Sequence, residues 1–181
     1  MNYADIKEYD VANGSGVRLS LFVSGCPHHC KNCFNEETWD YSYGKPFTEF
    51  EESKMISILK KKLGYIYDGL SILGGEPFAD ENKNDVLHFV KRVKKEIPDI
   101  NIWMYSGYLF EELIENDIKY EILSHINTLV DGRFVESLKD LKLRFRGSSN
   151  QRIIDVPESL KRHEVVLYKD LNVNREFQKH E

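Results

Sequence analysis

The three cysteines of the chain, Cys26, Cys30 and Cys33, lie in one short stretch with the spacing C-x3-C-x2-C. Zinc sites with four cysteines usually pair two short hooks that are far apart in sequence, and iron–sulfur clusters usually take four thiolates. Three thiolates in one loop therefore indicate a cluster with one open metal position, where a ligand can react. The spacing alone also leaves a zinc site open, in which His28 or His29 completes a Cys3His set.

A second stretch that can do chemistry is Gly74-Gly75-Glu76-Pro77, which directly follows a short apolar run. Glycine lets a backbone approach a ligand closely. Backbone carbonyls and a carboxylate can both accept hydrogen bonds from an amino group. On local grounds alone, the same stretch is equally well explained as a tight connection from a strand to a helix.

Together and in this order, the two stretches resemble the radical S-adenosylmethionine (SAM) superfamily. The resemblance implies that the three cysteines hold three irons of a 4Fe–4S cluster, whose fourth iron binds the amino and carboxylate groups of SAM. It also implies that Gly74, Gly75 and Glu76 meet the amino group of SAM. In that family one electron cleaves SAM to methionine and a 5′-deoxyadenosyl radical, which abstracts a hydrogen atom.

The residues around the third cysteine depart from the usual superfamily pattern. An aromatic residue normally precedes this cysteine and rests against adenine, but Asn32 stands there and Phe34 follows Cys33. The adenine contact is therefore assigned either to the backbone of residues 32–34 or to the ring of Phe34. This form resembles the activating proteins of anaerobic ribonucleotide reductases, as do the stretches at residues 37–40, 105–108, 130–134 and 146–152.

This closer resemblance, which spans residues 19–155, implies a function and further site residues. The expected protein is an oxidoreductase that generates a glycyl radical on the large subunit of an anaerobic ribonucleotide reductase, with a reductant protein such as a flavodoxin. Ser106 and Asp131 are expected to line the ribose and methionine of SAM, and no catalytic residue is expected beyond the cluster ligands. Ser106 and Asp131 each have a simpler alternative role, because Ser106 can belong to an ordinary turn and Asp131 can cap a helix near Phe134.

The basic stretch at residues 146–152 is interpreted as a docking surface for the reductase, with Arg146, Asn150 and Arg152 as partner-binding residues. The alternative is a flexible surface loop, because Gly, Ser and Asn favour turns. Two other functions stay open. One is a small radical SAM enzyme with a small-molecule substrate, such as a deazaguanine synthase; the other is a non-catalytic metal-binding or electron-transfer module. The Gly-Gly-Glu-Pro stretch disfavours the module, and the short chain and basic loop favour a protein substrate.

Length and composition set the class of the protein. A chain of 181 residues predicts one domain, residues 1–181, and 41% hydrophobic with 30% charged residues is typical of a soluble globular protein. The net charge of −5 gives no signature of nucleic-acid binding. No apolar run reaches the ~20 residues of a membrane helix, and the N-terminus lacks the build of a signal peptide. Clustered, odd cysteines argue against a disulfide framework, so we expect a cytoplasmic protein.

Apolar patterning alternates short strands with helices, which predicts an α/β fold. Helices are expected at residues 49–63, 82–96, 109–115 and 120–125, and strands at 6–11, 17–23, 70–73, 100–105, 128–130 and 165–168. A full eight-fold barrel needs about 250 residues, so we expect a partial, open (β/α) barrel of the radical SAM type. Its active site should lie at the carboxyl ends of the strands, and residues after 170 are expected to fray.

Overall fold

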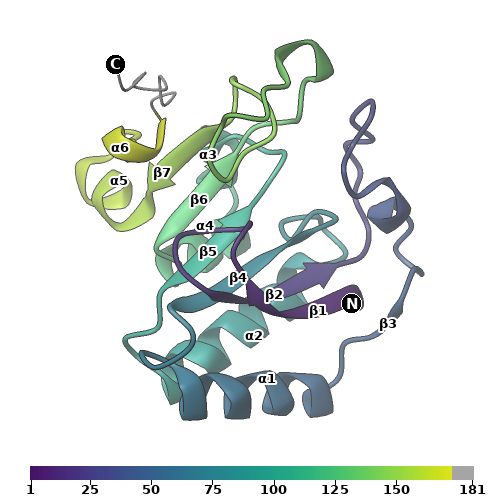
Figure 1. Ribbon diagram of the computed structural model, residues 1–181, viewed down its shortest axis with the longest axis vertical. Coiled ribbons are helices and arrows are strands. Elements are labelled where there is room, and N and C mark those ends of the chain that lie inside the picture. Colours follow the sequence, from purple (N-terminus) through teal and green to yellow (C-terminus); the bar gives the residue numbers. More distant parts are fainter. Residues whose placement is uncertain (173–181) are drawn as a thin grey trace, which may run out of the picture.

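A seven-stranded sheet forms the centre of the protein in the computed structural model, which describes residues 1–172 (Figure 1). The strands lie in the order β3-β1-β2-β4-β5-β6-β7. Their bounds are Asn2–Asp10 (β1), Arg18–Val23 (β2), Lys45–Pro46 (β3), Gly69–Gly74 (β4), Ile102–Tyr105 (β5), Thr128–Asp131 (β6) and Arg152–Asp155 (β7). The α/β class expected from the alternating pattern is therefore confirmed.

The four central strands, β2, β4, β5 and β6, are parallel and follow one another in chain order. Helices make the crossings between them, and further helices follow β7. The helix bounds are Glu49–Lys62 (α1), Lys83–Glu96 (α2), Phe110–Leu113 (α3), Asp117–Ser124 (α4), Val156–Arg162 (α5) and Lys169–Asn172 (α6). Because the strand order never reverses and crossovers keep one hand, successive helices fall on the same face of the sheet.

Helix α1 shows how the sequence sets an element's limits. Thr48 is its N-cap and, with Glu51, forms the expected capping box: the Thr48 hydroxyl accepts from the Phe50 amide, and the Glu51 carboxylate accepts from the Thr48 amide. The helix ends at Lys62, just before Gly64, which has a φ of +72°. Buried residues at helical spacing turn one side of α1 towards the sheet, namely Met55, Ile56 and Leu59.

The two faces of the sheet carry different side chains. On the helix side, alternate residues of the parallel strands join the buried helix residues in one large apolar core; examples are Leu21, Ile72, Met104 and Leu129. On the other side a smaller cluster gathers around Trp103, Val130 and Ile153, with Tyr105 and Phe145 packed against it. Helices α1 to α5 thus cover one face, and the opposite face is left to loops, α6 and a cavity.

The C-terminal third differs from the expectation. Strand β7 and helix α5 were not predicted, and β7 pairs antiparallel with β6, Ile154 lying opposite Leu129. The prediction of a strand at residues 165–168 is wrong; an isolated bridge joins Ile154 to Leu167 there, and α6 follows. The four-residue β7 has just two buried apolar residues, which is too short a pattern to detect beside the polar stretch before it. The expected fraying after residue 170 falls mainly on residues 173–181, outside the described part.

The hairpin of β1 and β2 covers one edge of the parallel strands. Residues Tyr3 to Asp10 of β1 pair antiparallel with β2, with two irregularities in the register, and β3 continues the sheet outward. The expected leading strand at residues 6–11 is therefore this hairpin arm. In the described residues, none of the helices combines the length and the apolar character that crossing a membrane requires.

Candidate functional site

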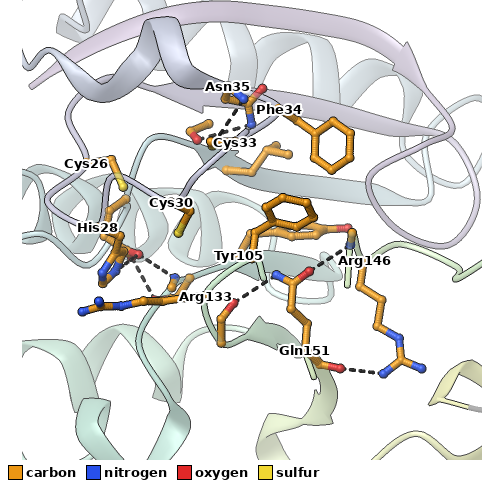
Figure 2. Close-up of a pocket in the computed structure, with 18 of the residues that line it drawn as sticks. Cys26, His28, Cys30, Cys33, Phe34, Asn35, Tyr105, Arg133, Arg146 and Gln151 are labelled. Carbon is orange, nitrogen blue, oxygen red and sulfur yellow. Dashed lines mark hydrogen bonds and ion pairs between the residues drawn. The ribbon is translucent and has the colours of Figure 1, made fainter. Parts of the chain in front are cut away.

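A cavity of about 450 Å³ lies at the carboxyl ends of the four parallel strands. The loops that follow these strands all contribute to it: the cysteine loop after β2, the glycine loop after β4, the Ser106-Gly107 turn after β5 and residues 132–134 after β6. In Figure 2 the cysteines line one side of this cavity, and Tyr105, Arg146 and Gln151 line the other. Its size falls in the range of small-molecule sites, about 300 to 1,000 Å³.

Both ends of the cysteine loop are anchored to backbone groups. The amides of Gly25 and Cys26 donate to the carbonyls of Thr38 and Trp39 at 2.8 and 3.1 Å. The Cys33 amide donates to the Cys30 carbonyl at 3.1 Å, which makes a tight turn between the last two cysteines. The three cysteines form no disulfide, are partly buried, and all line the cavity. The loop thus presents three thiols to one space.

Burial disfavours the ionised form of two of these thiols. It raises the pKa of Cys26 to about 11 and raises the pKa of Cys30, whose charge the neighbouring Cys33 also disfavours. A thiolate is the form that ligates a metal, and a bound cation removes the thiol proton. Cys26 and Cys30 therefore suit a positively charged metal centre better than they suit the role of a free nucleophile.

The two histidines of the loop are engaged elsewhere. The His28 ring lies 2.9 Å from the Glu76 carboxylate through Nε2 and meets Tyr108 edge-on at 4.5 Å. The His29 ring stacks on Trp39 with centroids 4.7 Å apart. Across residues 1–172, no three His, Cys, Asp or Glu side chains gather as they would around one metal ion. A single zinc needs four donors around one ion, whereas a cluster spreads its thiolates over several irons.

Glu76 joins three loops through its buried carboxylate. Oε1 accepts from the Phe78 amide at 3.0 Å and the Ser106 hydroxyl at 2.9 Å. Oε2 accepts from the Gly107 amide at 2.7 Å and lies 2.9 Å from His28 Nε2. The side chain is 1% exposed. The sequence marked Glu76 as a partner for the SAM amino group; in this structure both of its oxygens bind groups of the chain itself.

Both glycines of the Gly-Gly-Glu-Pro stretch are required by the chain's own packing. Gly74 has a φ of +104°, and a Cβ there would lie 2.7 Å from the Val23 carbonyl oxygen. A Cβ on Gly75 would lie 2.4 Å from the Gly25 carbonyl oxygen. The Gly75 amide donates to Val23, and the Glu76 amide to Gly25, at 2.7 and 2.8 Å. These contacts tie the glycine loop to the base of the cysteine loop.

Of the expected adenine contacts, Cys33 and Phe34 line the cavity. Phe34 is 61% exposed and meets Phe134 edge-on at 5.2 Å. Asn32 has a φ of +55°, is not among the cavity residues, and its side-chain amide donates to the Glu136 carboxylate. Phe34 and Phe134 together therefore give the cavity an apolar lining.

Ser106 and Asp131 occupy different surroundings. Ser106 lines the cavity, donates to Glu76 and accepts from the Tyr108 amide at 3.0 Å. Asp131 is fully buried and is not among the cavity residues. Its carboxylate accepts from the Phe110 amide at 2.8 Å, at the start of α3. Asp131 thus caps α3, and the short 3-10 turn Glu136–Leu138 after Phe134 has no side-chain cap.

The three expected partner-binding residues all bind groups of the chain. Arg152 donates to Asp131 Oδ1 at 2.9 Å and to both oxygens of Glu111, at 3.0 and 2.7 Å. Arg146 lies partly buried and donates to the Gln151 carbonyl at 2.5 Å, and burial lowers its pKa. Asn150 is exposed and donates to the Arg133 carbonyl at 2.8 Å. Only Arg146 of the three lines the cavity.

Gln151 is a site residue that sequence reasoning missed. Its side-chain oxygen accepts from the amides of Gly147 and Ser148 at 2.8 and 3.1 Å, and its side-chain nitrogen donates to the Gly132 carbonyl at 3.0 Å (Figure 2). One glutamine therefore braces the segment that borders the cavity. The contact with Gly132 joins residues 19 apart, which no local pattern reveals. The signal in the sequence was that Gln151 stands in the stretch at residues 146–152 that resembles the activating proteins.

Comparison with known proteins gives a consistent result. The family of 4Fe–4S single cluster domains matches residues 12–154. The chain is 42% identical to the anaerobic ribonucleoside-triphosphate reductase-activating protein of Escherichia coli K12 over 151 residues, which cover 83% of this chain and 96% of that protein. Proteins of the same name are similar in Vibrio cholerae (44% over 153 residues; 84% and 97% covered) and in Enterobacteria phage T4 (35% over 164 residues; 91% and 100% covered).

Proposed function

Because the chain belongs to the family of anaerobic ribonucleoside-triphosphate reductase-activating proteins, we propose that it installs a glycyl radical on such a reductase by radical SAM chemistry. The observation that carries the proposal is the cavity itself. The three cysteines, the Gly-Gly-Glu-Pro loop and the Ser106-Gly107 turn come from separate parts of the sequence, and all of them line it. A pure electron carrier has no use for the glycine loop or for space beside its cluster.

The sheet supports the finer proposal of a partial (β/α) barrel of the radical SAM type within a single domain, residues 1–181. Its parallel strands keep the chain order, and α1 to α5 cover only one face. One sector of a barrel would have that arrangement, with its inner face towards the cavity. The antiparallel β1 and β7 flank the four parallel strands, so the sheet does not close in the described residues.

The chain's residues have distinct parts in the proposed reaction. Cys26, Cys30 and Cys33 would hold a 4Fe–4S cluster, and Phe34 with the backbone of residues 32–34 would border adenine. When bound, the cluster and SAM would supply a 5′-deoxyadenosyl radical that abstracts a hydrogen atom from glycine, with one electron from the reductant consumed and methionine released. Glu76 fixes the positions of His28, Ser106 and Gly107 around that space, and Asp131 acts from outside the cavity by capping α3.

Backbone acceptors and the Glu76 carboxylate remain the proposed partners of the SAM amino group. Since both oxygens of Glu76 already accept hydrogen bonds in this structure, the amino group would add to those bonds or replace one of them. The open mouth favours a segment of a protein substrate over a small molecule. The reductant is proposed to be a flavodoxin-like protein, and the working compartment the cytoplasm.

The test is electron paramagnetic resonance on anaerobically reconstituted protein mixed with the large reductase chain, SAM and a reductant. We expect a doublet centred on the reductase, which collapses to a singlet when the reductase is labelled with deuterated glycine. Replacing Cys26, Cys30 or Cys33 by Ala should remove the cluster's iron and abolish the signal. Cleavage of SAM together with conversion of a small molecule, and with no signal on the reductase, would contradict the proposal.

A further inference from the structure

We infer that the reductase docks through an acidic, extended segment on a basic and apolar rim of the cavity, here called the rim patch; this inference rests on the proposed function. The rim patch consists of Phe34 and residues 133–144. It replaces the partner-binding set expected from the sequence, because Arg152 and Asn150 bind groups of this chain. The observations concern its apolar surface, its charge and its rigidity.

Large apolar side chains stand exposed along the rim patch. Leu141 is 85% exposed and Phe34 is 61% exposed, and both line the cavity. Leu138 and Val135 are 43% and 36% exposed. An exposed apolar group at the mouth of a cavity, rimmed by polar residues, is typical of an interaction site. Leu141 is the most exposed of these four, so we expect it to meet an apolar side chain of the partner.

The charge of the rim patch is opposite to that of the whole chain. Residues 133–144 carry four cations and two carboxylates, a local charge of +2, whereas the chain carries −5. Glu136 is already matched, since it lies 3.1 Å from Lys31. Among residues 1–172, four cations of this segment have no carboxylate within 4.0 Å; these are Arg133, Lys139, Lys142 and Arg144. Complementarity of charge therefore favours an acidic partner segment.

Hydrogen bonds hold the rim patch in place before any partner arrives. Lys139 bridges to Ser148, the Ser149 amide donates to the Leu138 carbonyl at 2.9 Å, and the Val135 amide donates to the Ser148 hydroxyl at 3.1 Å. The Lys139 ammonium lies 4.9 Å from the centre of the Phe34 ring, so it joins the two parts of the patch. Little ordering is then needed on binding, which favours affinity.

Together these features select one occupant. A glycine that reacts inside a cavity of about 450 Å³ must arrive on a thin, extended stretch of chain, because a helix is about 10–12 Å wide. The cations beside the mouth would pair with carboxylates flanking that stretch, and Leu141 would contact an apolar side chain beside them. The partner surface is thus an acidic loop of the reductase with an apolar anchor next to the glycine.

The test compares two double charge reversals in full-length, cluster-loaded protein with SAM. The first is Lys139→Glu with Lys142→Glu, in the rim patch. The control is Lys61→Glu with Lys95→Glu, which changes the charge equally at exposed positions near the C-terminal ends of α1 and α2. These helix ends lie near the amino ends of the parallel strands, away from the cavity at the carboxyl ends, because α1 leads into the start of β4 and α2 into the start of β5. Binding to the purified reductase is measured by biolayer interferometry at two salt concentrations.

We expect the rim-patch variant to bind the reductase at least about tenfold more weakly, with less salt dependence, and the control to stay within about twofold. Leu141→Ser should weaken binding without changing the salt dependence. All variants are compared at equal iron content, which shows that they fold. Equal affinities of the rim-patch and control variants would overturn the inference and leave the proposed function standing. No binding of the wild type to the reductase would overturn both the inference and the proposed function. Binding of a single-stranded oligonucleotide is measured in the same way, and a rim-patch variant that loses affinity only for the oligonucleotide would assign the patch to nucleic acid instead.

Discussion

Replacing Glu76 by glutamine should destabilise the apoprotein by about 2 to 4 kcal/mol. One carboxylate oxygen accepts hydrogen bonds from the Phe78 amide and the Ser106 hydroxyl. The other accepts from the Gly107 amide and contacts the His28 ring. Glutamine keeps one oxygen and turns the other into a donor. If the new amide faces His28, the imidazole can change tautomer and accept, but the Gly107 amide loses its acceptor. If it faces the other way, the Phe78 amide loses its acceptor.

Either orientation leaves one backbone amide of the Glu76 site without an acceptor. Such a loss costs about 1 to 3 kcal/mol, and the remaining bonds also lose the strength that a charged acceptor gives. The assay is urea unfolding of the anaerobic apoprotein, followed by circular dichroism. The control is Glu158→Gln on α5, a surface carboxylate paired with Arg162, which should leave the unfolding midpoint unchanged.

An equal midpoint for wild type and Glu76→Gln would refute this reasoning. It would mean that Glu76 does not join the three loops in the apoprotein and is free to receive a ligand. A clear loss of stability would instead mean that ligand binding competes with contacts that the fold already uses. The experiment therefore separates two accounts of the same residue, a ligand contact and a structural junction.

Three further predictions follow from buried or constrained groups. Arg152→Met should cost about 2 to 4 kcal/mol of unfolding free energy, because Asp131 keeps only the Phe110 amide. The hydrogen bond from Arg152 lowers the pKa of Glu111 below its ordinary 4.5. The ion pair of Arg152 and Glu111 therefore stabilises the fold above pH 4.5, and this stabilisation is lost as the pH falls through the lowered pKa. Urea titrations should show that the wild type loses more stability on acidification than Arg152→Met. Tyr105→Phe should leave stability unchanged or raise it by up to about 1 kcal/mol, because the buried hydroxyl has no partner in residues 1–172; a larger loss would contradict this. Gly74→Val should lower the melting temperature of the apoprotein as well as SAM affinity, and an unchanged melting temperature would show that Val23 and Phe22 can move aside.

The central strands and the loops that follow them could be predicted because each depends on a local signal. An apolar run such as residues 70–73, ended by two glycines, indicates a buried strand and its turn without any knowledge of the rest. The cysteine spacing is equally local. Since carboxyl ends of parallel strands share an edge, the position of the site then follows from the fold class. The local signals and the fold class agree for these strands and loops, and the structure has the predicted strands and loops there.

Contacts between distant residues could not be read in the same way. Asp131 and Arg152 each looked suited to a ligand or a partner, but they pair with each other because β6 and β7 are antiparallel neighbours. Strand β7 was not predicted from the sequence, so its pairing with β6 could not be predicted either. His28 shows the same limit: its contact with Glu76 joins two loops that meet only through the parallel pairing of β2 and β4.

The anchoring of the cysteine loop bears on how a metal centre can be assembled. In many small metal-binding domains, the site exists only when the metal is present, so that ligand binding and folding are one event. Here the ends of the loop are already closed by the amides of Gly25 and Cys26, and the Glu76 amide ties Gly25 to the glycine loop after β4. The conformational entropy of closing the loop is therefore lost during folding of the polypeptide. Iron and sulfide then enter a loop whose base is already closed, which makes removal and rebuilding of the cluster compatible with an intact fold.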